Sequence, residues 1–394
     1  MPPDWRWVKL DSACTFEYGK ALKKGNRDHT GKYPVYGSNG PVGFHNEYLV
    51  QGPGVVIGRK GGAGEVAYVR ENFWPIDTTY FLKLNTGASL TYFYFLLRSL
   101  QLSRFDKSTA IPGLNRNDAY DLEIPLPPLA TQQAIVAKIE ELFSELDKGI
   151  ESIKLAQQQL KTYRQSVLKA AFEGRLVGAQ DFVPQQAGEL PAGWKWVKSV
   201  ELFDFITSGS RGWAKYYSDS GAIFLRITNL DFDSLELDLA PEKIQRVKPP
   251  VNGEGTRTRV QAGDFLISIT GYLGMFAIAP ELEEAYINQH IALCRPKDTF
   301  NKKYVGYWII SKSGGHFHLN KMTKGATKAG LGLDDIRNFP VPMAPLAEQQ
   351  AIVAAIESRL SVADSLEATL AQSLQQSEAL RQSVLKQAFE GRLV

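Results

Sequence analysis

Apolar residues recur at spacings of three and four along two long segments of the chain, residues 131–173 and 348–390. This spacing places them on one face of an α-helix, and stripes of this length are typical of coiled coils. Pro125, Pro127 and Pro128 bar a helix before the first segment, and Gly174 ends it. We predict two helices of about 43 residues, roughly 65 Å long, whose apolar stripes cover each other. Apolar residues beside the stripe in the middle of the second segment leave the knobs-into-holes register open. The predicted stripes are Ile135, Ile139, Leu142, Leu146, Ile150, Ile153, Ala156, Leu160, Tyr163, Val167 and Ala171, and Ile352, Ile356, Leu360, Ala363, Leu366, Leu370, Leu374, Val384 and Ala388.

The two helical segments belong to an internal repeat. LATQQAIVAKIE at 129–140 recurs as LAEQQAIVAAIE at 346–357, and RQSVLKAAFEGRLV at 164–177 recurs as RQSVLKQAFEGRLV at 381–394. Between these blocks, residues 141–163 and 358–380 differ in sequence and match in length, as a rigid rod requires. DWRWVKL at 4–10 and GWKWVKS at 193–199 mark the start of each copy. We interpret the copies as variants of one domain that do the same job on different targets; neutral drift after duplication is the alternative.

Glycines, aromatic residues and short β-branched runs fill the stretches before each helix. Strand candidates are residues 55–57, 66–69, 80–84, 223–227 and 265–269. The predicted fold class is α+β, with two mixed domains joined by two long antiparallel coiled-coil-like helices in a pseudo-two-fold repeat. The predicted division is 1–125 for the first domain, 126–177 for the first helix, 178–192 for a linker, 193–342 for the second domain and 343–394 for the second helix.

Charge is informative in its distribution, since the net charge is only +3. Residues 299–333 contain six lysines and no acid. A second basic cluster holds Lys20, Lys23, Lys24, Arg27 and Lys32, and a third holds Lys243, Arg246, Lys248, Arg257 and Arg259. Local basic patches are the usual electrostatic footprint of phosphate binding, although a lysine-rich surface also serves solubility alone.

Composition argues against several classes of protein. Two distant cysteines, Cys14 and Cys294, exclude a disulfide scaffold and a cysteine-based zinc site, and suit a reducing cytoplasm. We expect neither a leader peptide nor a membrane span, because charges interrupt the N-terminus and no apolar run approaches about 20 residues. The string GNRDHTGK at 25–32 misses the P-loop spacing, and the five histidines show no metal-ligand pattern. We therefore expect no catalytic residue and no metal site.

Three pairs of loops are candidates for contact with nucleic acid: 57–64 with 267–274, 107–113 with 324–330, and 33–44 with 208–217. Glycine lets a backbone approach a phosphate closely, and asparagine and arginine read base edges through two hydrogen bonds. Tight turns and buried aromatic residues are the alternative interpretation of these loops. The candidate DNA-binding residues are Lys20, Lys23, Lys24, Arg27, Tyr36, Ser38, Asn39, Arg59, Lys60, Lys107, Thr109, Arg211, Trp213, Lys215, Arg226, Asn229, Thr270, Tyr272, Lys321, Lys324, Thr327 and Lys328.

The twin LAxQQAIVAxIE and RQSVLKxAFEGRLV blocks, the IPLPPL and VPMAPL stretches before them, and LPAGWKWV at 190–197 resemble the specificity subunit of type I restriction–modification systems. The resemblance covers the whole chain. It implies that each variable domain reads one half of a bipartite double-stranded DNA site, and that the antiparallel helices set the unread spacer between the halves. It also implies two methyltransferase subunits docked on this chain, with restriction subunits joining the complex. S-adenosylmethionine, ATP and Mg²⁺ belong to those partners, and this chain lacks their NPPY-type motif.

The repeated helix ends predict two equivalent docking surfaces for the methyltransferase subunits. The candidate partner-binding residues are Gln132, Gln133, Phe172, Arg175, Gln349, Gln350, Phe389 and Arg392. Three other functions stay open from the residues alone. They are a stand-alone two-headed DNA-binding regulator, an enzyme with a cryptic nuclease or phosphate-transfer site in the glycine-rich loops, and a structural coiled-coil adaptor.

Overall fold

The computed structural model describes residues 2–28, 30–85, 87–105, 113–177, 189–249, 257–323 and 330–394. It comprises two compact units, Met1–Leu155 with Leu370–Val394 (unit 1) and Ala156–Thr369 (unit 2). The predicted long helices are confirmed as α4 (Leu129–Phe172) and α8 (Leu346–Phe389). One part of each helix belongs to unit 1 and the rest to unit 2.

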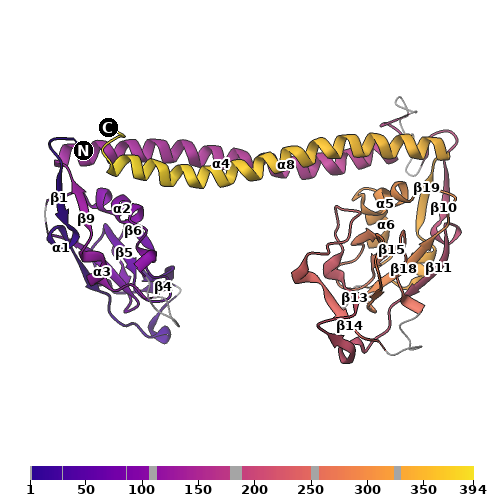
Figure 1. Ribbon diagram of the computed structural model, residues 1–394, viewed down its shortest axis with the longest axis horizontal. Coiled ribbons are helices and arrows are strands. Elements are labelled where there is room, and N and C mark those ends of the chain that lie inside the picture. Colours follow the sequence, from indigo (N-terminus) through magenta and orange to yellow (C-terminus); the bar gives the residue numbers. More distant parts are fainter. Residues whose placement is uncertain are drawn as a thin grey trace. The chain divides into compact units, whose positions relative to one another are not determined.

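Unit 1 contains three small sheets (Figure 1). The largest has the strand order β2 (Cys14–Tyr18), β8 (Thr79–Leu84), β5 (Gly54–Gly58) and β6 (Val66–Val69). A second has the order β4 (Gly40–His45), β3 (Tyr33–Gly37) and β7 (Trp74–Pro75), and a ribbon pairs β1 (Arg6–Lys9) with β9 (Glu123–Leu126). The short helices are α1 (Leu10–Ala13), α2 (Leu90–Ser99) and α3 (Arg116–Tyr120).

Unit 2 repeats this plan with different strands (Figure 1). One sheet has the order β11 (Phe203–Ser208), β18 (Ile291–Pro296), β15 (Phe265–Ser268) and β16 (Phe276–Ile278). Another has the order β12 (Tyr217–Ser218), β14 (Gln245–Val247), β13 (Ala222–Leu225) and β17 (Ala285–Ile287). A ribbon pairs β10 (Lys195–Lys198) with β19 (Pro340–Met343), and the short helices are α5 (Lys302–Ile310), α6 (Gly315–Lys321) and α7 (Leu333–Arg337). All five predicted strand segments coincide with strands of the structure, but residues 226–227 and 269 lie beyond the ends of β13 and β15.

The core of unit 1 includes the last turns of α8. Phe389 is buried and meets Tyr92 of α2 edge to face, with ring centroids 5.3 Å apart. The Tyr92 hydroxyl donates to the carbonyl oxygen of Pro125 over 2.8 Å. Val384, Leu385 and Ala388 belong to the same cluster. The prediction that Phe389 faces a partner protein is therefore wrong, because its ring is buried inside unit 1.

The core of unit 2 includes the last turns of α4 in the same way. Phe172 is buried against Tyr304 and Trp308, each ring centroid 5.2 Å away, and the Tyr304 hydroxyl donates to the Pro342 carbonyl oxygen over 2.8 Å. Phe172 is thus also wrong as a partner contact. Gly174 and Gly391 end the helices with φ of 74° and 72°, a conformation that disfavours other residues. Core packing explains why RQSVLKxAFEGRLV is nearly identical in both copies.

Ion pairs join the halves of α4 and α8 within each unit. In unit 2, Arg164 donates to Asp364 over 2.5 Å and to Glu367 over 2.9 Å. In unit 1, Arg381 pairs with Asp147, and its guanidinium carbon lies 5.1 Å from the centroid of the Phe143 ring. These contacts link early α4 to late α8 and late α4 to early α8, so the two helices are antiparallel in both units. Asp147 and Asp364 occupy equivalent positions in the divergent segments of the repeat.

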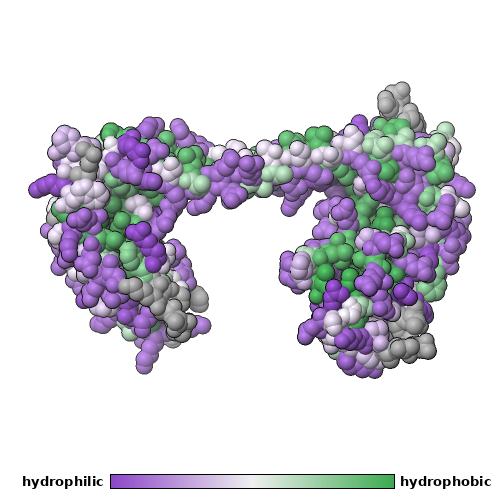
Figure 2. All heavy atoms as spheres, in the orientation of Figure 1, coloured by the Kyte–Doolittle hydropathy of each residue, from purple (hydrophilic) through white to green (hydrophobic). Residues whose placement is uncertain are grey.

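The predicted apolar stripes are buried toward the helix ends and mostly half buried between them. Ile135, Ile139 and Ile352 are almost fully buried. Tyr163 and Leu366 of the predicted stripes are exposed to 43% and 49%. On the side seen in Figure 2, hydrophobic residues alternate with hydrophilic ones along these helices. Two helices cover each other along one line, and the deepest burial occurs where a domain also lies alongside.

A buried glutamine fixes the start of each long helix. The Gln132 Nε2 donates to the Pro127 carbonyl oxygen, and its Oε1 accepts from the backbone N–H of Ser89, both over 2.8 Å. Gln349 repeats this with the Ala344 carbonyl oxygen at 2.7 Å and the Asn301 N–H at 2.9 Å. Both side chains are 3% exposed or less. Their prediction as partner contacts is wrong, because each instead ties a long helix to the strand before it and to a short helix.

Replacing either glutamine is expected to destabilise the unit that contains it. Gln132→Ala or Gln349→Ala leaves one buried N–H and one buried carbonyl without a partner, which costs about 1–3 kcal/mol for each group. Urea unfolding of the full chain measures the loss, and peptide-resolved hydrogen exchange localises it. The exposed neighbours Gln133→Ala and Gln350→Ala are the matched controls and should stay within about 0.5 kcal/mol of the parent chain. Equal losses in both pairs would contradict this role.

Candidate functional site

Each unit presents a glycine-rich loop of the same backbone shape, which we call its tip loop. In unit 1 it comprises residues 59–64 between β5 and β6, and in unit 2 residues 269–274 between β15 and β16. Gly61 and Gly64 have φ of 85° and 83°, and Gly271 and Gly274 have φ of 74° and 79°. Isolated β-bridges join Lys60 to Gly113 and Thr270 to Gly330. The backbone frame of the loop is thus duplicated with the repeat.

Both tip loops lie at the ends of their strands away from α4 and α8. In unit 1, Pro53 just before β5 lines a hollow beside Arg381 of α8, so the Gly58 end of β5 is the remote end. In unit 2, Pro280 just after β16 lines a hollow beside Arg164 of α4, which leaves the start of β16 remote. The long helices therefore hold each tip loop at the free end of its unit.

An arginine–tyrosine cluster adjoins the tip loop of unit 1. The Arg59 guanidinium donates twice to the Asp77 carbonyl oxygen, over 3.1 and 2.7 Å, and its central carbon lies 5.3 Å from the centroid of the Tyr18 ring. The guanidinium carbon of Arg116 lies 4.8 Å from the same centroid. Burial raises the pKa of the neighbouring Tyr80 to about 12, so its phenol stays neutral. Lys60 is exposed beside this cluster.

Sequence reasoning missed Tyr18 and Arg116. Tyr18 is half exposed at the end of β2, and Arg116 begins α3. Both come next to Arg59 only because β2 pairs with β8 and because the residues before α3 bridge to Lys60. The one available signal was that Arg116 closely follows a candidate loop.

The hairpin between β3 and β4 adjoins the tip loop of unit 1. Asn39 is exposed at its turn, and the Ser38 hydroxyl donates to the Thr78 carbonyl oxygen over 2.5 Å. A hollow of about 270 Å³ lies beside them, lined by Gly37, Ser38, Asn39, Gly40, Val56, Glu65, Val66 and Ala67. Tyr36 is half buried against Phe73, and burial raises its pKa. Asn39 is therefore available to a ligand, whereas Tyr36 and Ser38 mainly hold the hairpin.

The predicted basic cluster of unit 1 is mostly at the surface. Lys20, Lys23 and Lys24 are exposed, and Lys24 begins a short 3₁₀ turn. Arg27 is half buried, and its Nη2 donates to the Leu22 carbonyl oxygen over 3.2 Å. The three lysines can meet a polyanion, and Arg27 supports the loop that carries them.

Unit 2 exposes fewer of its predicted residues. Tyr272 is 72% exposed at its tip loop, and Arg211, Lys215 and Lys321 are exposed as well. The Thr270 hydroxyl is 2.5 Å from the Nδ1 of His290, so it is already engaged in the fold. The available side chains at this end of unit 2 are therefore one aromatic residue and a set of cations.

Two predictions in unit 2 are corrected by burial. Trp213 is 5% exposed and packs on Phe224 and Tyr286, with ring centroids 4.9 and 5.4 Å apart, so it cannot stack on a base. Asn229 is 1% exposed; its Oδ1 accepts from the Arg226 N–H at 2.8 Å and its Nδ2 donates to the Asp238 carbonyl oxygen at 2.9 Å. Asn229 therefore shapes a loop and does not read bases. Arg226 is half buried and donates to the Lys243 carbonyl oxygen over 3.2 Å, and its contact with DNA stays a prediction.

Five candidate residues lie outside the part of the chain that the structure describes. They are Lys107, Thr109, Lys324, Thr327 and Lys328. Their flanking residues Gly113 and Gly330 are the ones that bridge to the tip loops.

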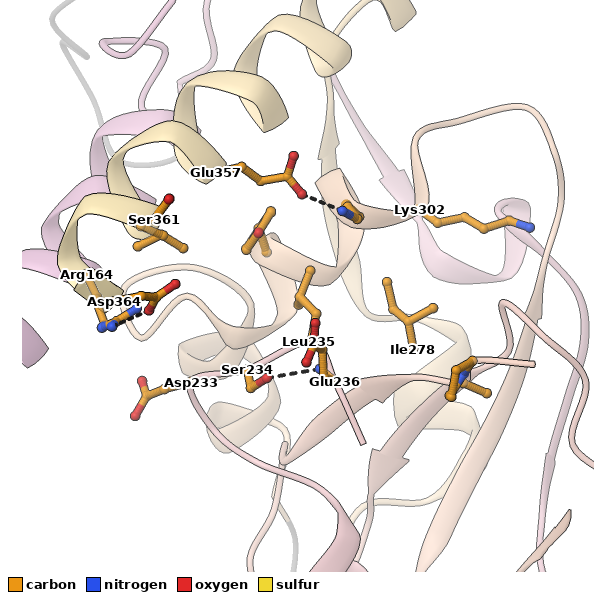
Figure 3. A pocket seen from close by; sticks show the side chains of 15 residues that line it. Arg164, Asp233, Ser234, Leu235, Glu236, Ile278, Lys302, Glu357, Ser361 and Asp364 are labelled. Atoms are coloured by element: carbon orange, nitrogen blue, oxygen red, sulfur yellow. Dashed lines mark hydrogen bonds and ion pairs between the residues drawn. The ribbon is translucent and has the colours of Figure 1, made fainter. Parts of the chain in front are cut away.

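A hollow of about 760 Å³ in unit 2 lies between its domain and the long helices (Figure 3). Two ion pairs line it, Lys303 with Glu357 at 2.5 Å and Arg164 with Asp364 at 2.5 Å. A similar hollow of about 670 Å³ in unit 1 contains the equivalent Arg381 and Asp147. Their recurrence beside the same ion pair indicates a consequence of the helix pairing.

The described residues contain no group of three or more His, Cys, Asp or Glu side chains placed to hold a metal ion. No helix among them is both long and apolar enough to cross a membrane.

The four remaining predicted partner contacts are exposed. Gln133 and Gln350 face solvent on the first turns of the long helices, next to Leu129 and Leu346, which are 47% and 49% exposed. Arg175 and Arg392 are exposed beyond the helix ends and pair with Glu173 and Glu390. These residues recur at equivalent positions in both copies.

Comparison with known sequences supports the resemblance. The family described as "Type I restriction modification DNA specificity domain" matches residues 2–155 and 250–376. The type I restriction enzyme EcoDI specificity subunit of Escherichia coli is 21% identical, over 100% of this chain and 89% of that protein. The EcoBI specificity subunit of Escherichia coli is 26% identical over 73% of this chain. That alignment spans 61% of the EcoBI protein, so this chain covers less than two thirds of the length of that relative.

Comparison with solved structures confirms the fold class. A chain from a study of complex assembly and conformational transition of the type I R-M system superposes with a TM-score of 0.72 at 21% identity, covering 100% of this chain and 99% of that one. The HsdS subunit from Thermoanaerobacter tengcongensis superposes with a TM-score of 0.56 at 22% identity, covering 100% and 98%. At this level of identity the likeness concerns the fold.

Proposed function

The chain belongs to the family of type I restriction–modification DNA specificity domains, and from this membership we propose that it selects the DNA site on which partner subunits act. One observation carries the proposal: the two units repeat the same tip-loop backbone and present different exposed side chains on it. A loop backbone that is duplicated while its exposed side chains differ suits two domains that each recognise a different half of the DNA site. Phosphate contacts position such a protein on DNA, and base-edge contacts specify the sequence.

The division of labour between subunits is part of the same proposal. This chain carries no catalytic step; two methyltransferase subunits supply S-adenosylmethionine chemistry, and restriction subunits supply ATP- and Mg²⁺-dependent cleavage. The exposed Gln133 and Gln350 on equivalent helix turns support two equivalent docking positions. A stand-alone regulator built on this fold would have no use for these duplicated solvent-facing turns.

Modified-base sequencing of host DNA tests the proposed function. Deleting the gene should abolish methylation at one bipartite sequence, and restoring the gene should restore it. Replacing residues 4–124 with the corresponding domain of another family member should change one half of that sequence and leave the other half unchanged. An unaltered methylation pattern after deletion would instead favour the stand-alone regulator.

Exposed lysines at the tip loop of unit 1 and on α6 of unit 2 are expected to contact phosphates. Lys60→Ala or Lys321→Ala should weaken binding to specific and unrelated DNA alike. Each should also reduce the dependence of log K on log salt by about one counterion. Binding of the assembled complex, titrated at several salt concentrations, measures both effects. The control Lys154→Ala removes the same charge from an exposed position on α4 and should change neither. A loss confined to the specific site would assign the lysine to base readout.

The duplicated helix turns predict the stoichiometry of the complex. Native mass spectrometry should find two methyltransferase subunits for each copy of this chain. Gln133→Arg or Gln350→Arg places a charge on one docking turn and should leave one methyltransferase bound, and the double variant none. Gln372→Arg makes the same change at an exposed α8 position outside the repeated blocks and should retain two. A single methyltransferase on the parent chain would overturn the symmetric arrangement.

A further inference from the structure

The two tip loops differ at four of six positions, among them residue 62 in unit 1 and its equivalent in unit 2, residue 272, which we call the outward position. Their backbone frames correspond: Lys60 and Thr270 make the equivalent bridge, and Gly61 and Gly271 share a positive φ. Ala63 and Leu273, which follow the outward position, are both 7% exposed. The N–H of Gly64 donates to the Gly58 carbonyl oxygen over 2.9 Å, and that of Gly274 to the Ser268 carbonyl oxygen over 3.0 Å. The outward position therefore changes from glycine to tyrosine on a shared frame, beside the exposed Lys60 of unit 1, which Thr270 replaces in unit 2.

Resting on the proposed function, we propose that this position determines base specificity in each unit, through Asn39 over Gly62 in unit 1 and through Tyr272 itself in unit 2. The chemistry of the two groups assigns an adenine to the first and a thymine to the second. The readout group thus comes from a neighbouring hairpin in one unit and from the loop itself in the other.

In unit 1, glycine at position 62 makes room for the amide of Asn39. A Cβ built on Gly62 would overlap the Asn39 Oδ1, so the amide occupies the space that a side chain would take. Asn39 is exposed, and its amide makes no hydrogen bond to another residue that the structure describes. A free carboxamide offers one donor and one acceptor side by side, which match the N7 and N6 of adenine in the major groove.

In unit 2, the Tyr272 side chain projects from the same position. Ser268 Oγ donates to the Tyr272 carbonyl oxygen and accepts from the Met275 N–H over 2.8 Å, so the backbone is held on both sides of the residue. The side chain is 72% exposed, the highest exposure of any described large hydrophobic residue. The backbone of this residue is held in place while its ring faces solvent, so the ring itself has no role in the fold of unit 2. An aromatic ring suits contact with the C5-methyl group of thymine, which is the apolar mark of that base in the major groove.

Single-atom changes in DNA test both assignments. The site is first defined by modified-base sequencing, and a domain swap assigns each half to its unit. The full chain, assembled with its partner subunits, is then titrated with duplexes in which one thymine of the unit-2 half is replaced by deoxyuridine, which lacks the methyl group. In other duplexes one adenine of the unit-1 half is replaced by 7-deazaadenine, which lacks N7. The adenine that becomes methylated is left unchanged.

The parent chain should lose about fourfold in affinity at one thymine, the value of one buried methyl group, and about 5- to 150-fold at one adenine, the cost of leaving the amide donor unpaired when N7 is absent. Tyr272→Ala should bind thymine and deoxyuridine duplexes equally, whereas Tyr272→Phe should still distinguish them. Asn39→Ala should bind adenine and 7-deazaadenine duplexes equally. Gly62→Ala should do the same while retaining Asn39, because its methyl group displaces the amide.

The control Tyr217→Ala removes another exposed tyrosine of unit 2 and should keep the parent discrimination. Variants that retain full discrimination, or half-sites without the required base, would overturn the assignment while leaving the proposed function intact. A parent complex that binds its methylated sequence no better than a scrambled duplex would instead refute the proposed function. Thermal unfolding of each variant separates lost contacts from lost folding, and Tyr272→Phe and Gly62→Ala provide the second, conservative readout.

Discussion

Each domain of this protein is completed by the long helix that leaves the other domain. Phe389 at the end of α8 fills the core of unit 1, and Phe172 at the end of α4 fills the core of unit 2. Burying an aromatic side chain of this size stabilises a core by about 1.5–3 kcal/mol, and neighbouring Val, Leu and Ala residues of the same turns add to it. Neither domain core is therefore complete within one copy of the repeat, and this dependence preserves both copies of the helix ends.

The start of each long helix is also fixed by buried contacts, and these contacts are the same in both copies. Gln132 and Gln349 each join three segments through buried hydrogen bonds. The hydroxyls of Tyr92 and Tyr304 donate to proline carbonyl oxygens in β9 and β19, the strands that precede the long helices. Such groups are costly to leave unpaired, so they fix a single arrangement of strand, short helix and long helix. The domain on this junction can then change its loops without changing its attachment.

This attachment to the long helices holds each tip loop at the free end of its unit. Glycines with positive φ and a short β-bridge define the same loop backbone in both units, remote from the helices. The exposed groups differ, with an amide over Gly62 and a phenol at position 272. A rigid frame lowers the entropic cost of presenting a side chain to DNA, so a change of exposed group on that frame can change the contacts made with DNA.

The sequence by itself determined the repeat, the two long helices, the strand segments of the domains and the family, because periodicity and repeated blocks are local properties of the chain.

The sequence did not determine which face of a repeated block is buried. Gln132 and Gln133 are adjacent and both recur, yet only the tertiary structure shows that the first is buried and the second exposed. Trp213 likewise has the residue type of a base reader, and partners as distant in the chain as Tyr286 bury it. The same holds for Asn39 over Gly62 and for Arg116 beside Tyr18, since strand pairing and bridges bring these residues together. Burial and hydrogen-bond partners depend on contacts between remote segments, and those contacts exist only in the folded chain.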